Sequence, residues 1–168
     1  MLRVISFIVT NQPGVLSRIS GLISRRGFNI ESLTVGVTSD PNLSRITIVM
    51  FAEDSIIEQV LKQFDKLLDV KAIKEIPLDK GTFREIALIK VNVADIIKKD
   101  FMKEVGARAG IVLDFGDATA TVQLTGTTTF INEGIEDFRQ FGIVELARTG
   151  MVALESGDAH LLEDEESY

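Results

Sequence analysis

The sequence predicts an α+β protein made of two consecutive ferredoxin-like βαββαβ domains, each an antiparallel sheet with two helices on one face. Apolar residues alternate or recur at helical spacing in the order strand, helix, strand, strand, helix, strand, and this order occurs twice. Residues 77–81, PLDKG, interrupt the pattern between the two series. With 168 residues, 45% hydrophobic and 26% charged, the chain has the composition of globular protein and room for two small domains.

The first domain is expected at residues 1–77, with strands at residues 2–10, 30–38, 45–51 and 70–76. Both faces of the first strand are apolar, which indicates a strand that is covered on both sides or is central in its sheet. One helix is expected from about Pro13 to Arg26, with Gly27 just after its end. A second helix follows, and Ser55 and Glu58 have the spacing of a capping box at its start.

The second domain is expected at residues 84–155, after a linker at residues 78–83. Its strands are expected at residues 84–93, 111–115, 119–126 and 143–154, with a helix capped by Asp95 and another at residues 129–141. Residues 156–168 end in the run Glu163, Asp164, Glu165, Glu166, which predicts a flexible acidic tail.

The strand at residues 30–38 is expected at the edge of the first sheet, because the βαββαβ topology gives the strand order 4-1-3-2. It carries Leu33, Val35 and Val37, and proteins rarely leave an apolar edge unpaired. We therefore expect a homodimer in which this strand pairs with the same strand of a second copy about a two-fold axis.

A Pro-Gly turn between the first strand and the first helix has the features of a small-molecule site. Gly14 has no Cβ, so a ligand can lie against its backbone, and the amides of Val15 and Leu16 stand at the positive end of the helix. Asn11 precedes the turn with a side chain that donates and accepts hydrogen bonds. This pattern predicts a pocket for the carboxylate of an amino acid, although Pro-Gly at such a junction is often only a turn.

Composition and charge exclude several other functions. The net charge is −7 and no run of Lys and Arg supplies a basic surface, which argues against nucleic acid binding. There is no Cys for disulfides, thiolate chemistry or a zinc site, and no apolar run approaches the roughly 18 residues of a membrane helix. A cytoplasmic location is expected, without a secretory signal.

A catalytic role is not expected. The only histidine is His160, close to the end of the sequence, so no Ser-His-Asp set can form. Asp114, Asp117 and Glu145 could in principle form an acid–base pair or hold a divalent ion, but turn and strand-end carboxylates are usually just solvated. We therefore assign no catalytic residue and no metal ligand.

Several segments resemble one family. NQPGVLSRISGLISRRGFNIESLTVGVT and LSRITIV, followed by REIALIKV and GIVELARTGMVAL, closely resemble the small, regulatory subunits of acetolactate synthase (acetohydroxyacid synthase). The resemblance covers most of the chain and implies that the first domain is an ACT domain. It implies a subunit that activates a separate catalytic large subunit and confers feedback inhibition by valine or another branched-chain amino acid. Thiamine diphosphate, FAD and magnesium are expected only in that partner, and no cofactor in this chain.

In that family, effectors bind at the interface between two ACT domains. Carried over by position, the helix-start turn of one copy and the second strand of the facing copy form the site. The predicted effector-binding residues are Asn11, Gly14, Val15 and Leu16 from one copy, with Asn29 and Ile30 from the other. Backbone amides would bind the carboxylate, the asparagines would orient the polar end, and Val15 with Ile30 would line an apolar niche. The alternative is a free-standing ACT-type amino-acid sensor that controls a different enzyme or a transcription factor.

Overall fold

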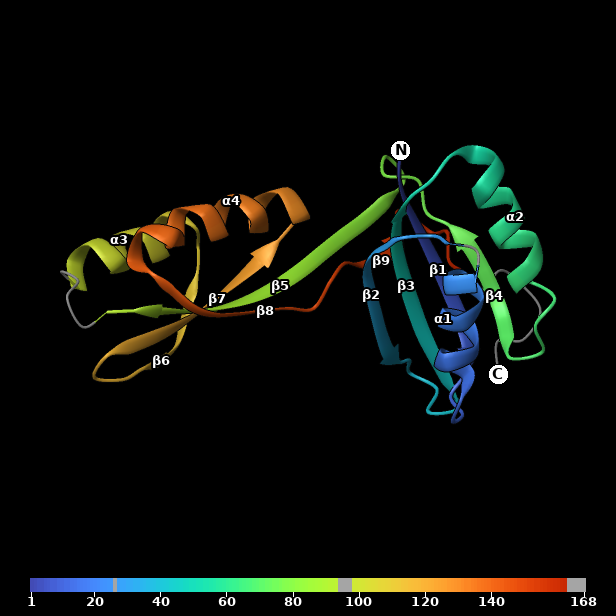
Figure 1. The fold of residues 1–168 in the computed structure, drawn as a ribbon, viewed down its shortest axis with the longest axis horizontal. Coiled ribbons are helices and arrows are strands. Elements are labelled where there is room, and N and C mark those ends of the chain that lie inside the picture. The colour runs from blue at the N-terminus through green and yellow to red at the C-terminus, as the bar shows by residue number, and fades with distance from the viewer. Residues whose placement is uncertain (26, 94–97, 163–168) are drawn as a thin grey trace. The chain divides into compact units, whose positions relative to one another are not determined.

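The computed structural model of the chain describes residues 1–25, 27–93 and 98–162. It contains two compact units, of which one comprises Met1–Thr82 with the residues from Met151 onward and the other comprises Phe83–Gly150. Each unit has an antiparallel sheet and two helices (Figure 1). The predicted fold class is confirmed. None of the described helices is long and apolar enough to cross a lipid bilayer.

The N-terminal unit has the predicted element order and strand order. Its sheet runs β2-β3-β1-β4, so that β2 lies at an edge, and β1 pairs along its whole length with β3. The elements are β1 (Leu2–Thr10), α1 (Val15–Arg25), β2 (Ile30–Val37), β3 (Leu43–Phe51), α2 (Asp54–Phe64) and β4 (Val70–Glu75).

Both helices cover one face of this sheet. Phe7 of β1 is fully buried there and meets Phe64 of α2 edge to face, with ring centroids 5.3 Å apart. Helix α2 begins at Asp54 behind an N-cap residue, Glu53, whose side chain makes no capping bond. The predicted capping box that starts at Ser55 is therefore wrong, and Asp54 supplies the negative charge that favours a helix start.

The other face of the sheet is also covered. Val4, Ile8 and Val49 alternate with the residues that face the helices, and each is at most 4% exposed. On the same face the hydroxyls of Ser6 and Thr47 lie 3.2 Å apart and satisfy each other. The prediction from the two apolar faces of β1 is confirmed, because this strand is buried along nearly its whole length.

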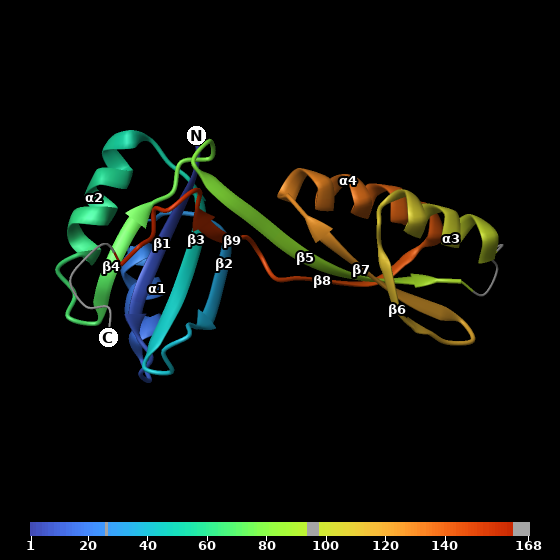
Figure 2. The same ribbon diagram turned by 180° about the vertical axis from the view of Figure 1, so that it is seen from behind.

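The cover on this second face is the end of the chain. Residues 151–162, here called the C-terminal strap, include strand β9 (Val152–Glu155) and lie across the sheet (Figure 2). Arg45 of β3 donates to the carbonyl oxygen of Ala153 at 2.9 Å, and Lys74 of β4 lies 2.8 Å from the carboxylate of Glu155. The strap thereby contributes buried Met151, Ala153 and Leu161 to the N-terminal unit.

The C-terminal unit repeats the topology, with strand order β6-β7-β5-β8. Phe101 is fully buried at its centre, in edge contact with Phe115, Phe138 and Phe141. Asp95, the predicted cap of the first helix in this unit, lies outside the described residues. The elements are β5 (Gly81–Asn92), α3 (Lys98–Ala107), β6 (Ile111–Phe115), β7 (Thr119–Gly126), α4 (Thr128–Phe138), the 3₁₀ helix η1 (Arg139–Phe141) and β8 (Ile143–Arg148).

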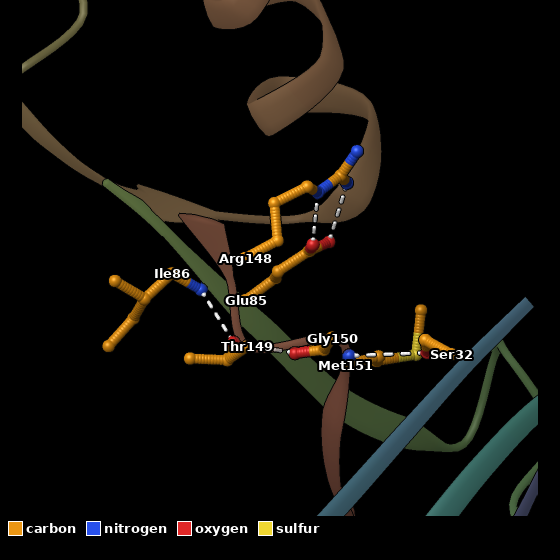
Figure 3. A network of polar contacts seen from close by, with 7 residues as sticks. All are labelled: Ser32, Glu85, Ile86, Arg148, Thr149, Gly150 and Met151. Carbon is orange, nitrogen blue, oxygen red and sulfur yellow. Dashed lines mark hydrogen bonds and ion pairs between the residues drawn. The ribbon is translucent and has the colours of Figure 1, made fainter. Parts of the chain in front are cut away.

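The single last strand expected at residues 143–154 is wrong, because the structure has two strands there. Thr149 and Gly150 separate β8 from β9, and Gly150 has a left-handed φ of 79° that interrupts an extended chain. The hydroxyl of Thr149 accepts from the Ile86 amide at 3.1 Å and donates to the Gly150 carbonyl at 2.7 Å (Figure 3). Just before this turn Arg148 makes a bidentate ion pair with Glu85, which is 4% exposed.

The unit boundaries differ from the expected domain boundaries at two places. We expected residues 84–155 to form the second domain, whereas the chain joins the N-terminal unit again from Met151 onward. Strand β5 begins at Gly81, inside the segment expected as the linker at residues 78–83. The charged end of the predicted tail, residues 163–168, lies outside the described residues.

A chain of residues 1–82 alone should be less stable than the same chain carrying residues 151–162 on a flexible linker. Without the strap, Val4, Ile8 and Val49 lose part of their cover, and we expect a difference of roughly 2–4 kcal/mol in the free energy of unfolding. Urea denaturation followed by circular dichroism measures it. Equal stability of the two chains would contradict an integral role for the strap.

Candidate ligand-binding site

The Pro-Gly turn connects the end of β1 to the start of α1. The amide of Arg18 donates to the Gly14 carbonyl oxygen at 2.9 Å, which makes Gly14 the first hydrogen-bond acceptor of the helix. Gly14 has a φ of 88°, and no other part of the described chain lies within 4 Å of the position a Cβ would occupy. The turn therefore needs glycine for its conformation, and its backbone is open to an approaching molecule.

The predicted residues around this turn have different surroundings. Asn11 is exposed and donates through Nδ2 to the carbonyl oxygen of Pro41 at 2.9 Å, which ties it to the loop between β2 and β3. Leu16 is exposed, as a surface site requires. Val15 is only 4% exposed and packs in the core, so the expected use of its side chain as a niche wall is wrong. Its backbone amide donates to the carbonyl oxygen of Gln12 at 3.4 Å, a long hydrogen bond that a ligand carboxylate would have to replace.

One charged group near the turn was missed from the sequence. Arg18, one helical turn after Gly14, forms an ion pair with Asp69. Asp69 also accepts from the Thr10 hydroxyl at 3.3 Å, and its carbonyl oxygen accepts from the Thr10 amide at 2.8 Å. The side chain of Arg18 is 54% exposed, and its charge is balanced by Asp69, so the pair adds no net charge beside the helix start. A cation one turn after Gly14 was the available sequence signal.

Asn29 and Ile30 lie at the far end of α1 from Gly14 in the same chain. The helix has 11 residues, which corresponds to about 16 Å. Asn29 donates to the carboxylate of Glu31 at 3.2 Å, and Ile30 packs against the core at the start of β2. A single chain thus brings together the four residues of the turn but not the two residues of the strand.

The strand register shows how a second copy could complete the set. Thr10 pairs with Leu43 and Val37 pairs with Ser44, so the turn lies beside the Val37 end of β2. In an antiparallel pairing of two β2 strands, the Ile30 end of one strand lies beside the Val37 end of the other. The start of the second copy's β2 would then lie near the Pro-Gly turn.

The exposed side chains of β2 fit such a pairing. Leu33, Val35 and Val37 lie on the helix-covered face of the edge strand, and the exposed fraction of Val37 reaches 60%. Leu16 of α1 adds another exposed apolar side chain on the same side of the sheet. An apolar row on an edge strand is the kind of surface that proteins cover by pairing.

Two of the three carboxylates considered for an acid–base pair, Asp114 and Glu145, lie far apart. Asp114 lies on β6 and Glu145 on β8, at opposite edges of the C-terminal sheet with two strands between them. That separation is about 14 Å. Within residues 1–25, 27–93 and 98–162, no group of three or more His, Cys, Asp or Glu could hold a metal ion.

Comparison with known proteins defines the class. Residues 5–72 match the family model described as "AHAS small subunit-like ACT domain", and residues 84–157 match "Small subunit of acetolactate synthase". The fold and the Pro-Gly turn are thus those of a protein with an N-terminal ACT domain.

The particular family follows from whole-chain relatives. A probable acetolactate synthase small subunit from Archaeoglobus fulgidus is 39% identical, over 94% of this chain and 99% of that protein. The small subunit of acetolactate synthase isozyme 3 from Escherichia coli K12 is 38% identical, over 94% and 98%. The crystal structure of the acetolactate synthase small subunit from Thermotoga maritima is 35% identical and superposes with a TM-score of 0.88, covering 95% of this chain and 99% of that one. The chain belongs to the acetolactate synthase small-subunit family, and this membership implies a regulatory role.

Proposed function

We propose that the chain is the regulatory subunit of an acetolactate synthase. It binds a catalytic large subunit, raises the turnover of that subunit and makes it sensitive to feedback inhibition by valine or another branched-chain amino acid. The observation that carries the proposal is the match to small subunits along nearly the whole of both chains. The thiamine diphosphate, FAD and magnesium of the reaction belong to the catalytic partner.

The effector binds between two copies of the chain. The amides after Gly14 bind the carboxylate, Asn11 and Asn29 orient the polar end, and Ile30 of the facing copy contacts the side chain of the effector. The open backbone at Gly14 and the register of β2 support this arrangement. An apolar contact discriminates one methylene by only about 1–3 kcal/mol, so leucine and isoleucine are expected to replace valine weakly.

Reconstitution tests the proposed function. Adding this chain to the purified catalytic subunit from the same organism should raise acetolactate formation, and valine should then lower it. The two proteins should also elute together in size-exclusion chromatography. An unchanged rate with separate elution would favour the free-standing amino-acid sensor instead.

Gly14→Asp should abolish valine inhibition while leaving activation intact, because its carboxylate would lie where the effector carboxylate binds. Gly14→Asn is the matched control, since asparagine has nearly the same shape, carries no charge and tolerates a positive φ better than most residues. We expect inhibition to be lost with aspartate and largely kept with asparagine, as measured by valine titration of the reconstituted enzyme. Equal loss in both variants would assign the effect to strain at a φ of 88° instead of charge.

Mixed dimers test whether the site is shared. Asn29→Ala should weaken valine binding in calorimetry, as Gly14→Asp does, because each removes one half of every site. In a dimer of one Gly14→Asp chain and one Asn29→Ala chain, one of the two sites keeps both native halves. Mixing the two variants should therefore restore binding to that one site. If the mixture binds no better than either variant, the two residues do not meet across subunits.

A further inference from the structure

The C-terminal strap contacts the N-terminal sheet through alternate residues. Met151, Ala153 and Glu155 face the sheet, whereas Val152 and Leu154 are exposed between them. This alternation is that of an extended segment with one buried side. The three inward residues contact three different strands of the sheet, β2, β3 and β4.

The first contact is on β2, at the end that carries the predicted effector residues. The amide of Met151 donates to the hydroxyl of Ser32 at 3.5 Å (Figure 3). The pairing of β2 with β3 shifts its register at a β-bulge between Ile30 and Ser32. Asn29 and Ile30 stand just before this bulge. Since β2 is an edge strand paired with β3 on one side, the strap adds a second support at this end.

The second and third contacts hold the strap in place. Arg45 stands opposite Gly36 of β2 in the sheet and donates to the carbonyl oxygen of Ala153. Burial lowers the pKa of the Arg45 guanidinium, and the nearby Glu155 carboxylate opposes this shift. Glu155 itself has a side chain only 10% exposed and pairs with Lys74. Charges buried in this way need their partners, so the strap has one defined position on the sheet.

The strap also has a defined starting point. Its first residue follows Gly150, whose positive φ turns the chain at the end of β8. Thr149 is bonded to Ile86 through both its backbone amide, at 3.0 Å, and its hydroxyl. These bonds fix the point at which β8 ends and the strap begins.

We propose that the C-terminal strap is a positioning element of the effector site. Through Met151 and Ser32 it holds the start of β2 in the position from which Asn29 and Ile30 reach the facing copy. This inference rests on the proposed function, because it concerns the same two-copy site. It extends the site to a segment that lies more than a hundred residues further along the chain and contacts no effector.

Effector binding and attachment of the strap must also be linked thermodynamically. If detachment of the strap weakens effector binding, bound effector must stabilise strap attachment by the same factor. Valine should therefore slow hydrogen exchange of the amides in β9, although those amides lie on the opposite face of the sheet from the helices.

The test compares Ala153→Gln with Leu154→Gln in the full chain. Ala153 is 3% exposed against the sheet, so glutamine there displaces the strap, whereas the same change at Leu154 lies on the exposed side. For Ala153→Gln we expect faster hydrogen exchange in β9 and about fivefold weaker valine binding in calorimetry. Leu154→Gln should match the unaltered chain in both measurements. Size-exclusion chromatography checks that both variants remain dimers.

The outcomes separate this inference from the proposed function. Faster exchange in β9 with unchanged valine affinity would overturn the positioning role. Should Ala153→Gln fail to fold or dimerise, Ser32→Ala removes only the acceptor for Met151 and should still weaken binding, and unaltered affinity there would likewise overturn the role. If the unaltered chain binds none of valine, leucine and isoleucine, the proposed effector function is refuted and the strap inference falls with it.

Discussion

The second apolar face of the N-terminal sheet imposes the main constraint on this fold. Two helices cover one face of the sheet, and Val4, Ile8 and Val49 would remain in water on the other. Residues 151–162 remove this surface from solvent, with ion pairs and hydrogen bonds that define where the strap lies. As a result, the first unit is built from both ends of the sequence, and the chain must leave it and return to complete it.

The exposed edge of the same sheet is a second consequence of its topology. The strand order places β2 at an edge, and three of its exposed side chains are apolar. The Pro-Gly turn lies at one end of this edge, and Asn29 and Ile30 lie at the other. Self-pairing about a two-fold axis would cover the edge and unite the two halves in one step, so dimer stability and effector binding would share the same interface.

Much of the fold was predictable because local patterns agree with the final packing. The period-two and helical spacings placed the strands and helices, and the βαββαβ order implied the edge position of β2. Pro13 and Gly14 marked the turn that opens α1. Errors arose where a distant contact overrides a local signal. The apolar pattern at residues 143–154 predicts one strand, but the chain forms two strands there, separated by a turn at Gly150. Val15 likewise has the right type for a niche but faces the core.

The amino-acid sequence alone specified the two βαββαβ series, the edge strand and the turn that opens the first helix, because periodicity and turn chemistry act over a few neighbouring residues. It also specified the family, since the motifs that carry the resemblance are contiguous. The strap, the pairing of Arg18 with Asp69 and the inward orientation of Val15 emerged only from the folded chain. Each depends on residues that are far apart in the sequence and become neighbours only in the folded chain.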